Sequence, residues 1–458
     1  MNSIFCLSPV DGRYSDKVAA LRPYLSEYGL MYYRVLVEVQ WFKHLSNTPS
    51  IKEVPKFSSD AILFLSNIVS NFSESDATLI KSIEKTTNHD VKAIEYFLKQ
   101  KIEENLELAQ YSEFIHFACT SEDINNLSYA LMLRDSISTV LIPEIHNVHT
   151  FILGMVDKYS DQPMLSRTHG QPASPTTLGK ELLNVAYRLH RQISSLKSIE
   201  YMGKINGAVG NFNAHIVSYP DANWTEIAES FVQSIGLVYN PLTTQIEPHD
   251  YIAECFDCFS RINTIFLDFS RDIWSYISLG YFKQKVVAGE VGSSTMPHKV
   301  NPIDFENAEG NLGVSNSILY HLASKLPISR LQRDLTDSTV LRSIAPGLAH
   351  SMIAYQSILK GLKKLELNSA NMHNDLISNV EVLGEAIQTV MRRFGIKNPY
   401  EKLKALTRGK SISLKDLYTF VDTLDLPQDT KRLLKSLKPE TYIGIAKHLC
   451  KEGLSYCK

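Results

Sequence analysis

The sequence predicts an all-α protein with three helical domains and a central bundle of long helices. Apolar residues recur at helical spacing from about residue 110 to residue 365. Few stretches alternate between apolar and polar residues as strands do. The chain has 458 residues, of which 44% are hydrophobic and 21% are charged, so it can bury a large core but exceeds one compact domain.

The predicted domains are an N-terminal helical domain over residues 1–110, a central bundle over 111–365 and a C-terminal helical domain over 366–458. In the first domain, shorter helical patterns are interrupted by the polar stretch 46–60. In the last domain, short helices are separated by glycine and proline residues, which end helices. The longest helices are therefore expected in the middle of the chain.

The central domain is expected to begin with a helix over residues 124–141 that resumes after Pro143. A second helix is predicted over 178–196, where apolar residues are spaced by three and four with charged residues between them. Ser174 and Pro175 offer this helix a cap and a first helical residue, and Gly203 marks its expected end.

Two further helices complete the predicted bundle. One follows Pro248 and carries apolar residues at helical spacing over 252–277, with no proline before Pro297. About thirty helical residues would span about 45 Å. The other begins behind Pro346 and covers residues 349–362. Helices this long and apolar are expected to bury their outer faces against other subunits.

Charge and targeting signals narrow the choice of partners. The chain has 47 Lys plus Arg against 49 Asp plus Glu and a formal net charge of -2, so no global field favours nucleic acid or an anionic membrane. We find no signal peptide and no run of about 18 apolar residues, which predicts a cytoplasmic protein without a membrane partner. Any anionic ligand must then be held by a local cluster of charges.

The six cysteines of so long a chain do not predict a disulfide framework. Cys255 and Cys258 form a C-x-x-C, but a zinc site needs two further ligands. Both also lie inside a periodic helical stretch, where residues i and i+3 share a buried face. We therefore interpret them as core thiols, and the sequence predicts neither a metal nor a cofactor.

A polar loop over residues 289–302 carries the residues best suited to chemistry. It contains two glycines and three adjacent hydroxyls, and it leads into a helix for which Asn301 is the expected cap and Pro302 the first helical residue. Helix starts expose unpaired N–H groups and the positive end of the dipole, which places Lys299 and Asn301 at an anion site. Composition alone favours such a pocket no more than a solvated loop.

Residues 292–302, which read G-S-S-T-M-P-H-K-V-N-P, resemble the signature of the fumarase, aspartase and argininosuccinate lyase superfamily. His298 is informative within this segment. Fumarases usually carry glycine there and argininosuccinate lyases glutamine, whereas histidine resembles the adenylosuccinate branch. In chain order, residues 120–126 and 166–173 are similar to the first and second signature segments of the superfamily.

The resemblance to the adenylosuccinate lyase branch extends from residue 11 to about residue 409 and is closest to its longer bacterial type. Residues 86–93 and 338–342 also match that branch. The resemblance implies β-elimination of fumarate from adenylosuccinate, giving AMP, and from SAICAR, giving AICAR, in purine nucleotide biosynthesis. The alternatives are another fumarate-releasing lyase, such as argininosuccinate lyase, and a helical scaffold that reused the fold without catalysis.

The resemblance also implies general acid and base catalysis without a metal. It makes Ser293 the base and His169 the general acid for the departing nitrogen. Serine is a poor base unless its alkoxide is stabilised, so a mobile loop that closes over the substrate is physically sensible. Spacing alone does not separate Ser293 from Ser294, or His169 from His89, and those alternatives stay open.

Substrate binding must neutralise one phosphate and two carboxylates, for which guanidinium groups suit because they bind oxyanions in a bidentate way. The substrate-binding residues that the resemblance implies are Arg13, Tyr14, Asn88, His89, Asp90, Thr120, Ser121, Gln245, Ser294, Lys299, Val300, Asn301, Asn307, Arg333, Ser338, Thr339, Val340, Leu341 and Arg342. They come from segments scattered over most of the chain. The resemblance accordingly implies a homotetramer whose active sites are shared among three subunits.

Overall fold

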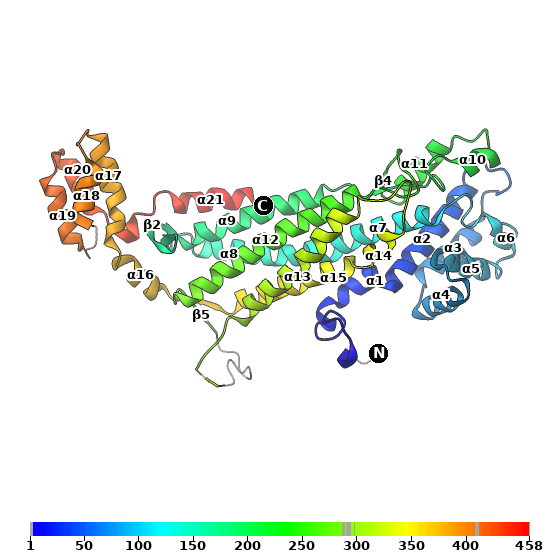
Figure 1. Ribbon diagram of the computed structural model, residues 1–458, viewed down its shortest axis with the longest axis horizontal. Coiled ribbons are helices and arrows are strands. Elements are labelled where there is room, and N and C mark those ends of the chain that lie inside the picture. Colours follow the sequence, from blue (N-terminus) through cyan, green and yellow to red (C-terminus); the bar gives the residue numbers. More distant parts are fainter. Residues whose placement is uncertain (1–2, 286–288, 290–294, 297, 408–411, 458) are drawn as a thin grey trace. The chain divides into compact units, whose positions relative to one another are not determined.

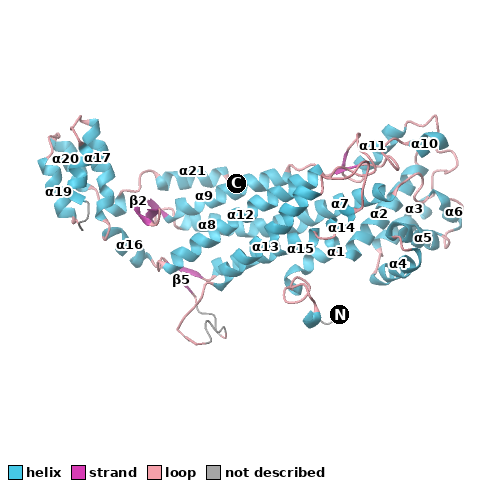
Figure 2. Ribbon diagram, viewed as in Figure 1, coloured by secondary structure: helices cyan, strands magenta, loops and turns pink. Residues whose placement is uncertain are grey.

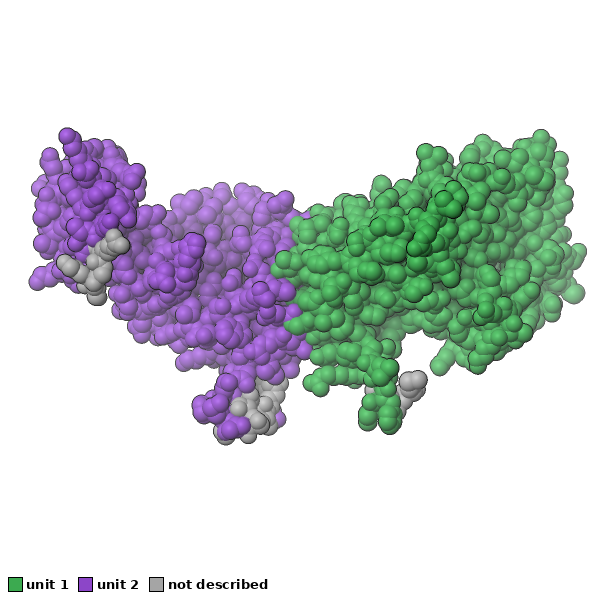
Figure 3. All heavy atoms as spheres, viewed as in Figure 1, with its two compact units in different colours: residues 1–145, 192–264, 310–355 green, residues 146–191, 265–309, 356–458 purple. Residues whose placement is uncertain are grey.

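The structure of the chain is a computed structural model that describes residues 3–285, 289, 295–296, 298–407 and 412–457. Helices dominate it, as predicted, and the described strands form three two-stranded sheets (Figures 1 and 2). The chain groups into two compact units, coloured green and purple in Figure 3. Unit 1 comprises residues 1–145, 192–264 and 310–355, and unit 2 comprises 146–191, 265–309 and 356–458. The division into three domains stays a prediction.

Unit 1 contains the N-terminal helices, the short elements between residues 192 and 250, and helix α14. The elements that lie wholly within it are η1 (Ser3–Phe5), η2 (Ser15–Leu21), α1 (Arg22–Leu25), α2 (Glu27–Ser46), α3 (Ser59–Ser70), α4 (Glu74–Thr87), α5 (Asp90–Ile102), α6 (Leu106–Ala109), η3 (Ser112–Phe114), α7 (Ser121–Ser136), η4 (Ile137–Leu141), β3 (Met202–Gly203), α10 (Asn213–Ser218), α11 (Trp224–Ser234), β4 (Val238–Tyr239) and α14 (Thr336–Leu341). Strands β3 and β4 pair in parallel.

Unit 2 contains two antiparallel strand pairs and the C-terminal helices. Its own elements are β1 (Pro163–Thr168), β2 (Gln171–Thr177), β5 (Phe282–Gln284), β6 (Leu365–Leu367), α16 (Ser369–Ile377), η5 (Val380–Leu383), α17 (Gly384–Arg393), α18 (Pro399–Thr407), α19 (Leu414–Thr423), α20 (Gln428–Ser436), η6 (Pro439–Thr441) and α21 (Ala446–Tyr456). Strand β1 pairs with β2, and β5 pairs with β6.

The long helices contribute residues to both units. They are α8 (Ile142–Lys158), α9 (Leu178–Lys197), α12 (Asp250–Ser278), α13 (Ile303–Lys325) and α15 (Ile344–Lys363). The long helix predicted after Pro248 is confirmed, because α12 has 29 residues. Cys255 and Cys258 are buried in it, and burial raises the pKa of both thiols, which fits the interpretation as core residues.

Two predicted helix boundaries are wrong. Ser174 and Pro175 lie in strand β2, and α9 begins only at Leu178. Pairing with β1 keeps this segment extended up to Thr177, whose hydroxyl then accepts a hydrogen bond from Lys180 N at 3.3 Å. Helix α13 begins at Ile303, so Pro302 precedes the helix and its carbonyl accepts from Phe305 N at 3.1 Å.

The expected break before Pro143 is also absent, because residues 121–158 are helical throughout. Residues Ile137–Leu141 form a π-helical turn, and Pro143 is the second residue of α8. A π turn changes the hydrogen-bond register and so accommodates a residue without an N–H group. The proline therefore alters the helix locally and does not end it.

By length and composition, Ser121–Lys158 is the one helix among the described residues that would be long and apolar enough to cross a membrane, with a mean hydropathy of 1.2 in its best window. Its α7 part buries Glu122, Asp123, Asn125 and Asn126 within unit 1. Such side chains are costly in lipid and ordinary in the interior of a helical bundle when they are hydrogen-bonded. We therefore interpret α7 as a core helix.

Candidate active site

His169 lies at the tip of the β1–β2 hairpin in unit 2. Thr168 pairs with Gln171, which leaves a two-residue turn of His169 and Gly170. Both residues have positive φ, 54° and 74°, as a type I′ turn requires. Glycine adopts this conformation freely, and histidine is one of the side chains that tolerate it. The hairpin therefore presents the exposed His169 side chain from a tight turn.

The signature segment is described only in part. Ser293 and Ser294, the predicted base and its competitor, lie outside the described residues. Lys299 and Val300 are exposed, and Lys299 N donates to Met296 O at 3.0 Å in a turn. Val300 O accepts a hydrogen bond from Gln284 Nε2 at 3.0 Å, which ties this end of the segment to strand β5.

Asn301 and Asn307 flank the start of helix α13 in the same unit. Asn301 lies two residues before the first helical residue, Ile303, close to the exposed N–H groups of the first turn. Asn307 is half-buried, and its Oδ1 accepts a hydrogen bond from Ser357 Oγ at 2.8 Å. The start of α13 has N–H donor groups that suit an anion, and the anion site itself stays a prediction.

In unit 1, Thr120 and Ser121 form the N-terminus of helix α7. Thr120 N donates to Asp123 Oδ2 at 2.8 Å, which caps the helix. The other Asp123 oxygen accepts from Lys204 Nζ at 2.8 Å, and both side chains of this ion pair are fully buried. Asn206 N and Gly207 N also donate to Asp123. This network fixes the helix terminus where the two hydroxyl residues lie.

The structure brings Arg333, Gln245 and Ser338 together, three residues that the sequence analysis assigns to substrate binding. Arg333 donates to Gln245 Oε1 at 3.2 Å and to Ser338 Oγ at 2.9 Å. It also forms an ion pair with the buried Glu122 at 2.8 Å. Burial raises the pKa of Glu122, and the Arg333 charge limits that rise. Arg333 is thus held by neighbours on three different segments of unit 1.

Arg342 and Asp90 also lie together in unit 1. Arg342 donates to Glu27 Oε2 at 2.9 Å and forms an ion pair with Asp90 at 3.4 Å. Asp90 makes a shorter ion pair of 2.7 Å with the buried Arg34. Burial favours the neutral form of Asp90, but the charges of Arg34 and Arg342 outweigh it, so the pKa of Asp90 lies below its usual range.

His89 caps helix α5, and this determines how it can donate protons. Its Nδ1 accepts a hydrogen bond from Lys92 N at 3.1 Å, so the proton of the neutral ring lies on Nε2. The preceding Asn88 ends helix α4 in the left-handed conformation, with φ of 51°. The side chain of His89 is exposed and offers a fixed N–H donor.

The remaining predicted residues lie in unit 1, on helix α14 and in the turn before η2. Thr339, Val340 and Leu341 belong to helix α14 together with Ser338; Thr339 is exposed and Leu341 is buried. Arg13 and Tyr14 precede η2, and the Arg13 guanidinium lies 5.9 Å from the centroid of the Tyr14 ring. The predicted site residues thus divide between the two units, each of which carries its own subset.

Sequence reasoning missed several partners of these residues. Arg34 and Glu27 hold Asp90 and Arg342, and Lys204 holds Asp123. Arg34 could have been noticed, because it is a cation inside the apolar run of α2. His249 was also missed: it is buried, has φ of 66°, and its Nε2 lies 3.6 Å from Asp337 Oδ2.

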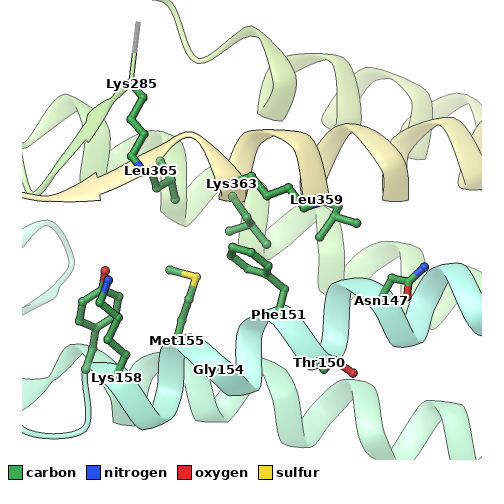
Figure 4. Close-up of a pocket in the computed structure, with 12 residues that line it drawn as sticks. Asn147, Thr150, Phe151, Gly154, Met155, Lys158, Lys285, Leu359, Lys363 and Leu365 are labelled. Carbon is green, nitrogen blue, oxygen red and sulfur yellow. The ribbon is translucent and has the colours of Figure 1, made fainter. Parts of the chain in front are cut away.

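A cavity of about 780 Å³ lies in unit 2 and is not lined by the predicted site residues (Figure 4). Phe151, Met155 and Leu359 form its apolar part, and Lys158 and Lys363 lie at its margin. We therefore do not assign the chemistry to it. Among the described residues, no group of three His, Cys, Asp or Glu side chains is placed to hold a metal ion.

Comparisons with known proteins identify the family of the chain. Residues 12–315 match a protein family described as lyase, and residues 329–443 match adenylosuccinate lyase C-terminal. The adenylosuccinate lyase of Escherichia coli (strain K12) is 60% identical over 446 residues, which cover 97% of this chain and 98% of that protein. The adenylosuccinate lyase of Haemophilus influenzae is 58% identical, with 98% of each chain covered.

Two solved structures show the same fold at low sequence identity. The 3-carboxy-cis,cis-muconate lactonizing enzyme of Pseudomonas putida has a TM-score of 0.75 at 18% identity and covers 96% of this chain and 97% of that chain. A fumarate lyase of Mesorhizobium sp. BNC1 has a TM-score of 0.75 at 16% identity, with coverage of 95% and 97%. At these identities the likeness concerns the fold alone.

Proposed function

The chain belongs to the adenylosuccinate lyase family, and from this premise we propose that it removes fumarate from adenylosuccinate, giving AMP, and from SAICAR, giving AICAR. The observation that carries this proposal is the 60% identity to a curated adenylosuccinate lyase over 97% of the chain. Both substrates share a succinylamino group and a ribose phosphate. One site can therefore process both, since the reacting atoms are the same.

The reaction breaks a C–H bond and a C–N bond on adjacent carbons of the succinyl group. A base removes the proton beside one carboxylate, and the electron pair then forms the double bond of fumarate as the nitrogen leaves with a proton from the acid. The carbanion that develops is tolerated only if its charge spreads onto the neighbouring carboxylate. Lys299, Asn301 and the start of α13 have the positive charge and N–H donors for that role.

Within this proposal Ser293 is the base and His169 the general acid. The support for His169 is its position at the tip of a tight hairpin, where a proton donor can reach a bound substrate. His89 serves better as a binding group, because its Nδ1 is occupied in capping α5 and only Nε2–H is presented. Arg333 and Arg342 are assigned to the anionic groups of the substrate, with Gln245 and Ser338 beside them.

The proposed assembly is a cytoplasmic homotetramer with active sites shared among three subunits, without nucleic-acid or membrane partners. A shared site has a direct test, because two inactive variants can complement each other. Ser293→Ala and His169→Ala proteins, mixed and allowed to exchange subunits, should regain part of the activity. If the mixture stays inactive although the subunits have exchanged, the shared site is refuted.

The activity itself is tested by incubating the purified protein with adenylosuccinate and measuring fumarate and AMP. We expect equal amounts of both products, and a loss of about 10²- to 10⁴-fold in kcat for His169→Ala and for Ser293→Ala. Argininosuccinate and malate serve as controls for the sister lyases and should not react. Release of fumarate from argininosuccinate, or no turnover of any of the three, would contradict the proposal.

A further inference from the structure

Helix α16, near the start of the C-terminal region, holds the hairpin that carries His169. Asp375 of α16 accepts a hydrogen bond from Arg167 Nη2 at 2.6 Å, in an ion pair whose two side chains are about three-quarters buried. Arg167 lies on β1, two residues before His169. An ion pair in this partly buried position restrains orientation more than an exposed pair does, because less water competes for the charges. The β1 strand is thus fixed close to its catalytic tip.

An apolar contact supports the same side of the hairpin. Leu165 on β1, Leu376 on α16 and Val382 on η5 form one buried cluster, with 2%, 1% and 8% of their surfaces exposed. Leu376 is the neighbour of Asp375 in the helix, so α16 offers the strand an apolar residue and a charged one side by side. Ser174 on β2 also donates to Glu385 of α17. The C-terminal region therefore contacts both strands of the hairpin.

The same carboxylate also holds the segment that leads into strand β5. The Tyr281 hydroxyl donates to Asp375 Oδ2, the oxygen that Arg167 uses. Burial raises the pKa of Tyr281, and the nearby Asp375 charge raises it further, so the hydroxyl keeps its proton for this bond. Tyr281 directly precedes β5, which runs from Phe282 to Gln284.

Two further hydrogen bonds join the start of α16 to this segment. Asn368 N donates to Tyr281 O at 2.8 Å, and Asn371 Nδ2 donates to Leu279 O at 2.8 Å. Strand β6 directly precedes α16 in the chain, and it pairs with β5 in an antiparallel register (Figure 1). Gln284, the last residue of β5, donates to Val300 O in the signature segment. Helix α16 thus contacts one catalytic segment through β1 and supports the strand that precedes the other.

We propose that Asp375 is a positioning residue that clamps the general-acid hairpin and strand β5 to helix α16 through one carboxylate. This inference rests on the proposed function, because that function assigns the chemistry to His169 and to the signature segment. An ionised carboxylate suits the position, since it accepts both donors at once and balances the Arg167 charge. An asparagine here would keep an acceptor oxygen but lose the charge that holds the guanidinium.

The test compares substitutions at Asp375 with a matched control in the full-length protein. Asp375→Asn should lower kcat for adenylosuccinate about tenfold to a hundredfold while KM changes less than about threefold, because displaced catalytic groups slow chemistry more than binding. Asp375→Glu retains the carboxylate and should stay within about threefold of the unchanged protein. The control is Glu381→Gln, which removes an exposed carboxylate of the same region and should leave kcat unchanged.

Amide hydrogen exchange separates positioning from general stability. Asp375→Asn should speed exchange both in the hairpin, residues 163–177, and in residues 281–285, with no comparable change elsewhere. Tyr281→Phe removes only one of the two donors, so it should speed exchange in residues 281–285 and leave the hairpin protected. This milder variant keeps the test decisive if Asp375→Asn folds poorly.

Several outcomes would overturn the clamp. They are an unchanged kcat in Asp375→Asn, an equal loss of kcat in Asp375→Asn and Asp375→Glu, and unchanged amide exchange of Asp375→Asn in the hairpin or in residues 281–285. The exchange measurement does not depend on turnover. If the unchanged protein fails to cleave adenylosuccinate, the proposed function fails, while exchange in the variants still decides whether the carboxylate holds both segments.

Discussion

At the scale of single residues, buried charged side chains hold residues of the proposed site. Asp123 accepts a hydrogen bond from Thr120 N. Glu122 forms an ion pair with Arg333. Arg34 forms an ion pair with Asp90. A buried charge is tolerated only with a partner and further hydrogen bonds, so each of these contacts restricts the neighbouring side chain to one orientation. The rigid partners reduce the reorganisation needed when an anionic substrate binds.

The Lys204–Asp123 pair provides the first prediction. Both side chains are fully buried, so Lys204→Met leaves the Asp123 carboxylate with backbone donors only. We expect a loss of about 3–5 kcal/mol in the free energy of unfolding, because one buried charge remains unpaired. The double variant Lys204→Met, Asp123→Asn removes that charge and should be more stable than Lys204→Met alone.

Urea denaturation at one fixed protein concentration checks this, because stability of an oligomer depends on concentration. Simple addition of the two single-variant effects in the double variant would show that the pair is not coupled.

The two competing histidines give the second prediction. His89→Asn retains a good helix cap but shortens the donor, so it should raise KM for adenylosuccinate and lower kcat only slightly. His169→Asn should lower kcat about 10²- to 10⁴-fold with little change in KM, because a proton donor acts in the transition state. Steady-state kinetics of the two variants decides between the roles, and a reversed pattern would make His89 the acid.

At the scale of elements, a tight hairpin turn and two helix starts carry residues of the proposed site. The β1–β2 hairpin turns in two residues, α5 begins after His89, and α7 begins after Thr120. Hairpin turns and helix starts both hold their backbone by local hydrogen bonds, so they position a side chain without a large core around it. The family resemblance of their sequence segments singled out these residues, but neither the hairpin nor the two helix starts were predicted.

The tip of that hairpin gives the third prediction. Gly170 has φ of 74°, and a Cβ atom there would meet no other atom within 4 Å, so Gly170→Ala introduces backbone strain without a steric clash. We expect a cost of about 1 kcal/mol in stability and a loss of roughly tenfold in kcat, as the turn shifts His169.

Gly384→Ala is the matched control, because its Cβ would meet only Leu403 Cδ2 at 4.0 Å and its backbone is helical. It should leave kcat unchanged and stability within about 1 kcal/mol. Thermal unfolding and kinetics of the pair provide the measurement, and equal activity of both variants would argue against a strict requirement for the turn.

At the scale of the whole molecule, two buried histidines are expected to make the free energy of unfolding depend on pH in the acidic range. Burial lowers the pKa of His149 to about 4 and that of His215 to about 4. Neither ring nitrogen of His215 has a hydrogen-bond partner among the described residues. Their ordinary pKa is about 6.5. Between these values the unfolded chain binds more protons than the folded one.

The fourth prediction follows from this difference. Stability should fall as the pH decreases from about 6.5 to about 4, and each histidine should contribute up to about 3 kcal/mol to that fall. His149→Gln and His215→Gln cannot titrate in this range, so the slope of unfolding free energy against pH should be shallower in each variant. Slopes equal to that of the unchanged protein would mean that both histidines stay accessible to protons in the folded state.

The sequence by itself determined the helical fold class, the long α12 helix and the family, because apolar periodicity and the signature segments are local patterns that need no knowledge of distant contacts. The family segments also singled out His89, Thr120 and His169, which lie at two helix starts and in a turn in the structure. These features follow from neighbouring residues, and so short-range physics suffices for them.

Only the tertiary structure decided which side chains meet. Arg333 with Gln245, Arg342 with Glu27 and Arg167 with Asp375 are pairs 88, 315 and 208 residues apart in sequence. Strand β2 was missed for the same reason, because pairing with β1 outweighed the local helix-start signal at Ser174 and Pro175. Contacts between distant segments depend on how the whole chain buries its apolar surface, and no local pattern records that arrangement.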